Sequence, residues 1–384
     1  MHQDHAPHPT EPTLPGQAPR AVEFFAGIGL ARLGLEAGGF QVVWSNDADP
    51  AKHALYLGNF GGSHPFVLGD VRDVRAADLP DDVGLAWASS PCTDLSLAGG
   101  RAGLHGAESG TFWEYIRVLD EMGDTRPPVA VLENVVGLAT SHGGDDLVAA
   151  ITAFNRLGYC VDVLAIDARR FVPQSRPRLF LVAARTPGPS DPTEHELRPD
   201  WLSWVFEDPR LRTHRERLAT PPPLLTSGLA SCVEDVPDAD ERWWDDERTG
   251  RFVASLSPVQ RDRVDRLRLG GQVCYRTAYR RTRNGAAVWE VRPDDIAGCL
   301  RTARGGSSKQ AIVQLGHGRL RVRWMTPREY ARLMGADDYR LSGERANRQL
   351  FGFGDAVVVP VVEWLARNYL MPLVVAQAAE RRFS

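Results

Sequence analysis

The segment AVEFFAGIGLARLGLEAGGFQVVWSND, residues 21–47, constrains the fold more than any other part of the sequence. An apolar run ends at Phe25, a glycine-rich turn follows, and the pattern of apolar residues then predicts a helix over 30–37 and a strand over 41–45. A strand, a tight turn and a helix in this order are typical of a βα unit, and open α/β sheets bind ligands beside such turns. The chain therefore begins like a ligand-binding α/β domain.

The same alternation continues along the chain. Apolar runs at 84–88, 128–132 and 179–184 are separated by helical patterns such as TFWEYIRVLDEM and DDLVAAITAFNRLG. Strands that alternate with helices favour an α/β fold, here with a Rossmann-like, doubly wound mixed sheet. The alternation ends near Ala184, and the pattern after Trp201 is irregular, so we expect a second, smaller and irregular domain.

These changes in pattern predict the domain organisation. We expect a disordered tail over 1–19, a first domain over 20–190, a small domain over 191–348 and a closing segment over 349–384. The proline-rich stretch RTPGPSDPTEHELRPD marks the linker to the small domain, and AVVVPVVEWLARNYLMPLVV resembles a helix that returns to the first domain.

Charge is unevenly distributed. The whole chain carries a net charge of −4, but residues 251–330 hold 17 Arg and Lys against 6 Asp and Glu, a local net charge of +11. A basic region attached to an acidic remainder indicates a surface built for nucleic acid.

The five cysteines are odd in number and widely scattered, with no CxxC spacing for zinc and no disulfide framework. They are Cys92, Cys160, Cys232, Cys274 and Cys299. We therefore expect reduced thiols in a cytoplasm. We also expect no membrane partner, because no run approaches about 18 consecutive apolar residues and the N-terminus lacks the order of a signal peptide.

The first turn suggests a nucleoside ligand. An acid at the end of the second strand, Asp47, can hold ribose hydroxyls, and Asp70 in LGDVRDV could accept a hydrogen bond from an adenine amino group. Arg32 stands where a pyrophosphate fingerprint has its third glycine, and S-adenosylmethionine is a nucleoside cofactor without a pyrophosphate. An ordinary βα turn without a ligand remains the alternative at this point.

Eight motifs occur in order: FFAGIGLARLGLEAGGF, SNDAD, GDV, SPCTDLSLAGG, LENVVG, VPQSRPRLFLVA, WMTPREYARLMG and FGDAVVVP. Together they resemble the DNA cytosine-C5 methyltransferase family, from about Ala21 to Asn368. The interruption between about Thr186 and Ala297 falls where family members carry a variable target-recognition segment. The resemblance implies that 20–190 is the catalytic domain that binds S-adenosylmethionine and that 191–348 is the DNA-recognition domain.

The resemblance implies a covalent mechanism on a cytosine flipped out of duplex DNA. Cys92 would add to carbon 6 and so push electron density toward carbon 5, while the carboxyl group of Glu133 would act at N3. Arg176 and Arg178 would grip the flipped nucleotide, since alternate residues of an extended segment point the same way. No metal is required.

The resemblance also implies the cofactor contacts, which begin with Asp47 to the ribose and Asp70 to the adenine. The other contacts carried over are Phe25, Gly27, Gly29, Pro91, Asp355, Ala356 and Val357. Two positions depart from the family pattern. Thr93 follows the Pro-Cys pair in place of glutamine, and Asp355 replaces an asparagine, so a cofactor-side amide has become a carboxylate.

The basic, tyrosine-containing stretch CYRTAYRRTRNG lies in the variable region between about Trp201 and Leu300, where we expect DNA sequence preference to reside. A companion restriction endonuclease acting on the same site is possible, as in restriction-modification pairs. We expect a monomer that is associated with the nucleoid in a bacterial cytoplasm.

Three other functions fit parts of the sequence. A nicotinamide oxidoreductase would share the glycine turn and Asp47, but it would leave Cys92 and Glu133 unexplained. An inactive DNA-binding regulator of the same fold would be expected to lose one of these two residues. An RNA cytosine-5 methyltransferase of the same family would be separated by comparing tRNA with duplex DNA as methyl acceptor.

Overall fold

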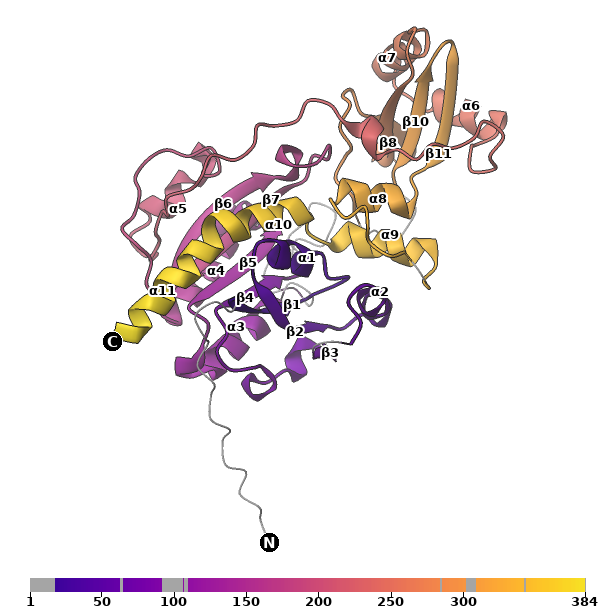
Figure 1. The fold of residues 1–384 in the computed structure, drawn as a ribbon. Helices are drawn as coiled ribbons and strands as arrows, with labels where there is room; N and C mark the ends of the chain where they lie inside the picture. Colours follow the sequence, from indigo (N-terminus) through magenta and orange to yellow (C-terminus); the bar gives the residue numbers. More distant parts are fainter. Residues whose placement is uncertain are drawn as a thin grey trace.

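The structure is a computed structural model that describes residues 18–62, 65–91, 106, 110–283, 285–301, 309–341 and 343–383 (Figure 1). Most of the predicted N-terminal tail and the predicted nucleophile Cys92 therefore lie outside the described residues.

A seven-stranded sheet with strand order β3-β2-β1-β4-β5-β7-β6 forms the large domain. Its strands are β1 (Arg20–Phe24), β2 (Gln41–Asp47), β3 (Phe66–Leu68), β4 (Leu85–Ser89), β5 (Val129–Val135), β6 (Cys160–Asp167) and β7 (Pro177–Ala184). β7 runs antiparallel to both of its neighbours, while the pairs from β3 to β5 are parallel. The predicted doubly wound mixed sheet is confirmed. The strand order reverses between β1 and β4, and open α/β sheets bind ligands at such a point.

Helices cover both faces of this sheet, and the two faces form separate hydrophobic cores. Successive β1 residues point to opposite faces, so Ala21 packs on the side of α1 (Leu30–Ala37) and α10 (Val359–Leu365), and Val22 packs on the side of α3 (Thr111–Glu121) and α4 (Asp145–Arg156). Burial on both faces accounts for the continuous apolar runs of β4 and β5 in the sequence.

The C-terminal segment lies against α1. A Cβ atom built on Gly34 would come within 2.5 Å of Val362 Cβ, and one on Gly38 within 2.2 Å of Ala366 Cβ. Glycine at these two positions therefore lets α1 and α10 approach closely. A π-helical turn (Ala366–Leu370) and α11 (Met371–Phe383) continue the segment across the large domain.

Residues 346–378 form a helical stretch that is long and apolar enough, by length and composition alone, to cross a membrane. However, 67% of its most apolar window is buried inside the protein. A buried apolar stretch of this kind is what the core helix of a globular domain presents, and here it packs on α1.

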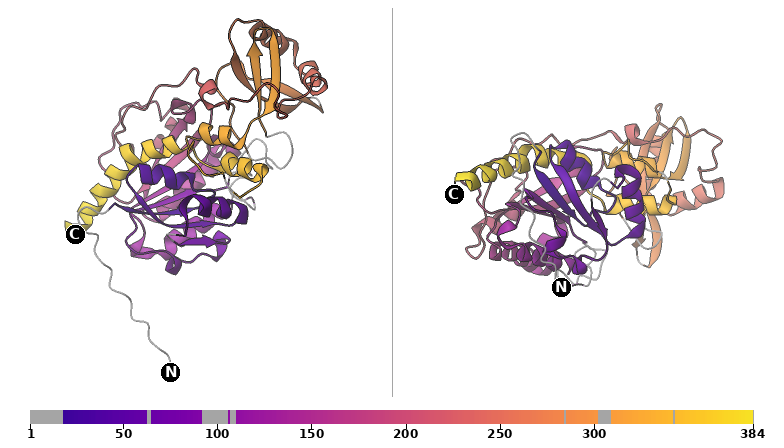
Figure 2. Two further views of the ribbon diagram at one scale, coloured as in Figure 1. Left: turned by 45° about the vertical axis from the view of Figure 1, so that its right-hand side comes forward. Right: turned by 60° about the horizontal axis from the view of Figure 1, so that its bottom comes forward.

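The small domain contains a second sheet of four strands in the order β11-β10-β8-β9. Its antiparallel strands are β8 (Cys274–Arg283), β9 (Ala286–Val291), β10 (Ala311–Gly316) and β11 (Arg319–Trp324). The helices α6 (Asp246–Ala254) and α7 (Pro258–Arg268) pack on one face of it, around Phe252, Trp289 and Trp324. This domain projects from one end of the large domain (Figure 2).

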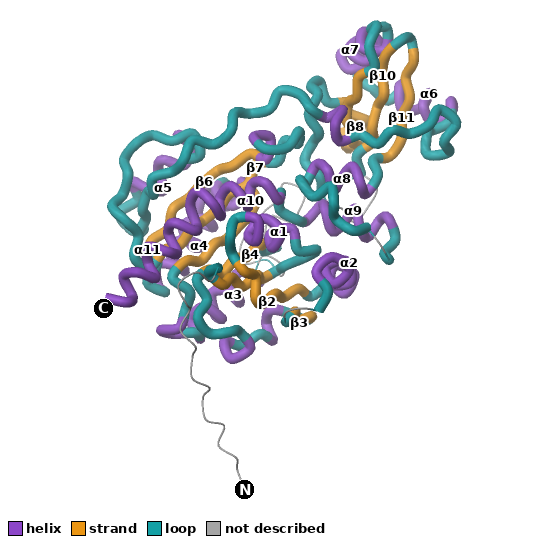
Figure 3. The backbone as a smooth tube through the Cα atoms, viewed as in Figure 1, coloured by secondary structure: helices purple, strands orange, loops and turns teal. Residues whose placement is uncertain are grey.

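The small domain is more regular than the sequence pattern indicated. Two strands of its sheet, β8 and β11, carry arginine or tyrosine at many positions, and this hides the apolar alternation by which a strand is recognised. The connection that leads to it is irregular, as expected, because between α5 (Ser203–Glu207) and α6 the chain runs mostly as loop (Figure 3).

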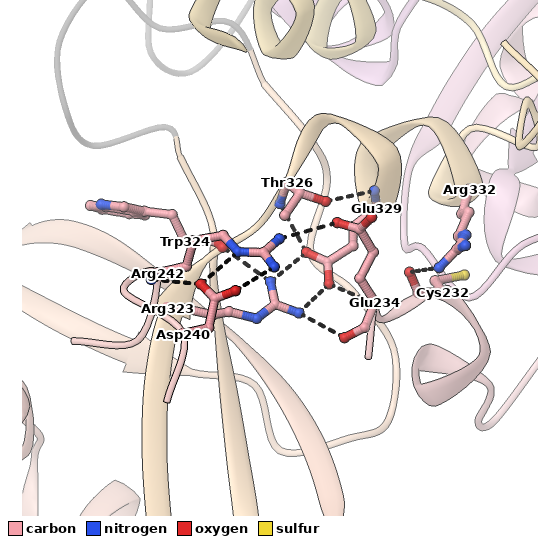
Figure 4. Close-up of polar contacts among 9 residues, drawn as sticks. All are labelled: Cys232, Glu234, Asp240, Arg242, Arg323, Trp324, Thr326, Glu329 and Arg332. Atoms are coloured by element: carbon pink, nitrogen blue, oxygen red, sulfur yellow. Dashed lines mark hydrogen bonds and ion pairs between the residues drawn. The ribbon is translucent and has the colours of Figure 1, made fainter. Parts of the chain in front are cut away.

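A buried ion pair lies where the chain leaves the small sheet (Figure 4). Arg323 of β11 donates to Glu329 of α8 (Pro327–Leu333) with Nη1 2.8 Å from Oε2, and both side chains are 0% exposed. Glu329 also accepts from the backbone N–H groups of Thr326 and Glu234 at 2.9 Å each. The Glu329 carboxylate thus binds both Glu234, which precedes the small sheet, and Arg323 and Thr326, at its end. The next helix, α9 (Ala346–Asp355), leads back to the large domain.

Candidate active site

The predicted catalytic carboxyl group lies at the carboxyl end of β5. Glu133 pairs with Ser89 at the end of β4, and the two strands run parallel, so both ends reach the same edge of the sheet. β4 leads through Ser90 to Pro91, and the described residues stop there, immediately before Cys92 and Thr93. Adjacent parallel strands therefore bring Glu133 close to the start of the segment that carries the predicted nucleophile.

Asn134 connects the ends of these two strands. Its side-chain amide nitrogen donates to Ser90 Oγ at 3.0 Å, and its side-chain Oδ1 accepts from the N–H of Val135 at 2.8 Å. The sequence pattern marked LENV as a motif, but it did not reveal this bond. Asn134 therefore fixes the backbone just ahead of Pro91.

Glu133 is buried and paired with an arginine. Its Oε1 lies 3.1 Å from Nε of Arg178, and its side chain is 8% exposed. Burial raises the pKa of Glu133, although Arg178, Arg176 and the Ser89 hydroxyl all oppose the shift. The group is therefore easier to protonate than an ordinary glutamate, which suits a carboxyl that must share a proton with a ligand.

The two arginines that we expected to act together line the same pocket but have different main partners. Arg178 lies in β7 opposite Val135 and turns toward Glu133. Arg176 is buried, and its guanidinium donates to the carbonyl oxygens of Leu300 at 2.7 Å, Gly354 at 3.0 Å and Ala356 at 2.7 Å. β7 begins only at Pro177, so the strand alternation that we used for the pair does not extend to Arg176.

Arg176 thereby connects the catalytic end of the sheet to the last motif. Glu133, Arg176, Arg178 and Val357 line one pocket. The thiol of Cys299, which the sequence did not single out, lies 3.4 Å from Nη1 of Arg176. Burial raises the pKa of this thiol, but Arg176 and Arg178 outweigh burial, so the net shift is downward. The four cysteines within the described residues are free thiols.

The glycine turn after β1 adopts the backbone conformation that a close ligand approach needs. Phe25, Gly27 and Gly29 have φ angles of 57°, 56° and 83°. A positive φ at a non-glycine residue such as Phe25 is uncommon and costs energy, and such strain gathers at functional sites. A Cβ on Gly29 would meet Phe60 at 2.4 Å, so glycine is needed there.

Asp47 holds this turn from the end of β2. Its Oδ2 accepts from the N–H of Gly27 at 2.8 Å, and its Oδ1 accepts from the N–H of Asp49 at 2.8 Å. A carboxylate has about four acceptor positions, so both oxygens can still accept from a ligand hydroxyl. The structure thus places Asp47 beside the turn, as a ribose contact requires.

Asp70 follows β3, the next strand along this edge. Its carboxylate accepts from the N–H of Arg72 at 2.9 Å and forms an ion pair with the Arg72 guanidinium at 2.9 Å. The amide of Asn46 donates to the carbonyl oxygens of Val67 and Gly69, which ties this loop to the end of β2. Asp70 therefore lies at the same edge of the sheet as Asp47, with the Arg72 guanidinium beside it.

The last motif joins the same edge. Asp355 ends α9, and its Oδ2 lies 2.8 Å from Nζ of Lys52 in α2 (Pro50–Phe60). The carbonyl of the next residue, Ala356, is held by Arg176. The sequence analysis did not single out Lys52, because no motif contains it.

This arrangement fits a nucleoside cofactor such as S-adenosylmethionine. The left-handed turn exposes backbone at the strand reversal, and acids stand at the ends of two adjacent strands, β2 and β3. The residues that would hold the cofactor thus border the edge at which Glu133 lies.

Comparisons with known proteins agree with this arrangement. The sequence model of the family described as C-5 cytosine-specific DNA methylase matches residues 20–370. The Type II methyltransferase M.Bsp6I of Bacillus sp. (strain RFL6) is 27% identical over 90% of this chain and 96% of its own length. The Type II methyltransferase M.HhaI of Haemophilus parahaemolyticus is 27% identical over 91% of this chain and 93% of its own length.

Solved structures show the same fold. The Dnmt2 methyltransferase of S. pombe superposes with a TM-score of 0.62 at 18% identity, covering 92% of this chain and 98% of the other. The methyltransferase EhMeth of Entamoeba histolytica gives a TM-score of 0.56 at 12% identity, covering 94% and 99%. Since the family match extends over most of the sequence and over both halves of the site, the chain belongs to the C-5 cytosine-specific DNA methylases.

Proposed function

We propose that this enzyme methylates carbon 5 of a cytosine within a specific duplex DNA sequence, through a covalent adduct of Cys92 with a base flipped out of the helix. The observation that carries the proposal is the buried pair of Glu133 and Arg178. The pair lies at the carboxyl end of β5, and the neighbouring parallel strand, β4, is followed by Cys92 in the sequence.

The chain's residues divide the chemistry between them. The Cys92 thiolate forms a bond to carbon 6, and the electron pair of the C5–C6 double bond moves into the ring. Glu133 holds a proton at N3, where negative charge would otherwise build up, and Arg178 orients its carboxyl group. When bound, S-adenosylmethionine would supply the methyl group to carbon 5, and its sulfonium would leave as a neutral thioether. Loss of the carbon-5 proton then allows the C6–S bond to break.

Nine residues would hold the cofactor: Phe25, Gly27, Gly29, Asp47, Asp70, Pro91, Asp355, Ala356 and Val357. The positive φ angles of the turn and the bond between Asp47 and Gly27 support this assignment for the residues at β1 and β2. The contact of Arg176 with Ala356 supports a positioning role for Arg176, in place of direct contact with the nucleotide.

The small domain would read the DNA. We assign residues 20–190 and 349–384 to the catalytic domain and residues 191–348 to target recognition, with the four-stranded sheet as the reading unit. Its strand β8 carries four of the region's arginines at 276, 280, 281 and 283. The relatives named Type II methyltransferases favour a role in restriction-modification, with a companion endonuclease that cuts the same site. We propose a monomer that acts in a bacterial cytoplasm, at the nucleoid.

The proposal is tested with duplex DNA that contains 5-fluorocytosine in many sequence contexts, incubated with enzyme and S-adenosylmethionine. Fluorine at carbon 5 cannot leave as a proton, so the enzyme should remain attached to the DNA on a denaturing gel. The band should vanish in Cys92→Ala and persist in Cys160→Ala, a matched control at another free thiol. A wild-type enzyme that binds cofactor and DNA but never cross-links would refute the mechanism, and tRNA as methyl acceptor would then be tested.

A further inference from the structure

Lys52 forms an ion pair at the edge of the predicted cofactor site. Its Nζ lies 2.8 Å from Oδ2 of Asp355, and the side chains of the two residues are 21% and 43% exposed. The lysine stem passes over the glycine turn, with its Cδ 4.0 Å from the position that a Cβ on Gly27 would occupy. The two charges therefore lie beside the backbone that approaches the cofactor.

The ammonium group of Lys52 is surrounded by carboxylates. Burial lowers its pKa, but Asp355 and then Asp47 outweigh burial, so the net shift is upward. Asp47 is the predicted ribose ligand, and it accepts from the N–H of Gly27. The ion pair of Lys52 and Asp355 thus lies close to Asp47, the predicted ribose ligand.

Packing of α9 on the large domain does not depend on this pair. Gly352 of α9 fits closely against Ile28, and Tyr339 donates from its hydroxyl to the carbonyl oxygen of Ile28 at 2.7 Å. Arg176 holds the carbonyl of Gly354. Partly exposed ion pairs add little to stability, so a purely structural clamp is a weak explanation for Lys52 and Asp355.

The methionine end of S-adenosylmethionine has matching charges. If Asp70 contacts the adenine and Asp47 the ribose, the amino-acid end must extend past Asp47 along the turn. That end carries an α-carboxylate and an α-ammonium on one carbon. A lysine and an aspartate that already face each other can separate when the ligand binds. The lysine can then pair with the α-carboxylate and the aspartate with the α-ammonium.

We propose that Lys52 binds the α-carboxylate of S-adenosylmethionine and that Asp355 binds its α-ammonium, so that the pair selects cofactors with an intact amino-acid end. The inference rests on the proposed function. It also explains why the last motif has a carboxylate in place of the family's asparagine, since Lys52 supplies a partner for the charge.

Calorimetric titration of the full chain with three ligands tests this assignment. The ligands are S-adenosylmethionine, its decarboxylated form, and the analogue in which an oxo group replaces the α-amino group. Wild type should bind S-adenosylmethionine about tenfold more tightly than either analogue, as expected for one charge-assisted hydrogen bond. Lys52→Met should lose the preference over the decarboxylated ligand. Asp355→Asn should lose the preference over the oxo analogue.

Lys309→Met is the matched control, because Lys309 is the other lysine of the sequence and pairs with Asn347. Its three affinities should equal those of wild type. If Lys52→Met weakens all three ligands equally, or preserves the wild-type ratio, the pair is a clamp and the inference is overturned. Unchanged thermal unfolding of each variant rules out misfolding as the cause. A wild type that binds none of the three ligands would overturn the proposed function as well.

Discussion

Nε of Arg178 lies 3.1 Å from Oε1 of Glu133, a contact created by the antiparallel pairing of β7 with β5. The pair combines two opposite effects on the carboxyl group. Burial raises its pKa, whereas the guanidinium lowers it, and burial prevails. Glu133 can therefore hold a proton where an exposed glutamate would be ionised, and the contact of Arg178 with Oε1 orients the carboxyl group.

Replacing Glu133 with Gln should lower kcat by about a hundredfold or more, the usual contribution of general acid catalysis. Affinity for DNA should change little, because the amide keeps the shape of the side chain. In wild type, kcat should fall as pH rises through the raised pKa of Glu133, and this descending limb should be missing in Glu133→Gln. Methylation rates across a pH series provide the measurement. Equal rates for the two proteins would contradict the assigned role.

Arg176→Met should destabilise the fold by about 3 kcal/mol, because three buried carbonyl groups lose their charged donor. Arg178→Met should destabilise the fold less but lower kcat more, because its partner is the carboxyl group proposed to act in catalysis. Urea unfolding and initial rates, measured on both variants, separate the two roles. The reverse pattern would show that Arg176 is the arginine that reaches the nucleotide.

Glu23 gives the fold a pH dependence of its own. Burial raises the pKa of this carboxyl to about 8, although Arg32 lowers it. The folded state then binds a proton that the unfolded chain has already released, so stability should fall as pH rises from about 4.5 to 8. Glu23→Gln should remove this loss, which amounts to roughly 5 kcal/mol at most. Urea unfolding at the two ends of this pH window provides the test, with the exposed Glu207→Gln as control. A Glu23→Gln protein that keeps the wild-type slope would contradict the role of Glu23.

The ion pair of Arg323 and Glu329 should behave as a buried pair. Glu329→Gln should destabilise the protein by about 3–5 kcal/mol, because it leaves a buried guanidinium without its counter-charge. The apolar double variant Arg323→Met with Glu329→Leu should recover only part of this loss, because the backbone N–H groups of Thr326 and Glu234 still lose their acceptor. Unfolding can be followed by tryptophan fluorescence, since Trp244, Trp289 and Trp324 cluster in the small domain. A single variant that costs less than about 1 kcal/mol would mean that water reaches the pair.

Gly34→Ala should destabilise the protein by about 1–3 kcal/mol, because the added methyl group would overlap Val362 of α10. Gly250→Ala is the matched control. Gly250 lies in α6 with nothing within 4 Å of an added Cβ, so alanine should raise stability by up to about 1 kcal/mol through helix propensity. Thermal unfolding of the two variants should shift in opposite directions.

The sequence by itself determined the family and the fold class, and it supplied the candidates for the reacting groups. Turn chemistry and the apolar runs of a doubly buried sheet are local, so they can be read from consecutive residues such as 21–47. The order of the motifs also placed Glu133 at a strand end and Asp47 beside the glycine turn.

Only the tertiary structure decided which partner each of these side chains meets. Arg176 and Arg178 are two positions apart, yet one holds three backbone carbonyls and the other holds Glu133. Lys52 meets Asp355 from the other end of the chain, and no spacing predicts that contact. The reason is physical: periodicity encodes which face a residue occupies, whereas its partner depends on strand pairing and helix packing between distant segments.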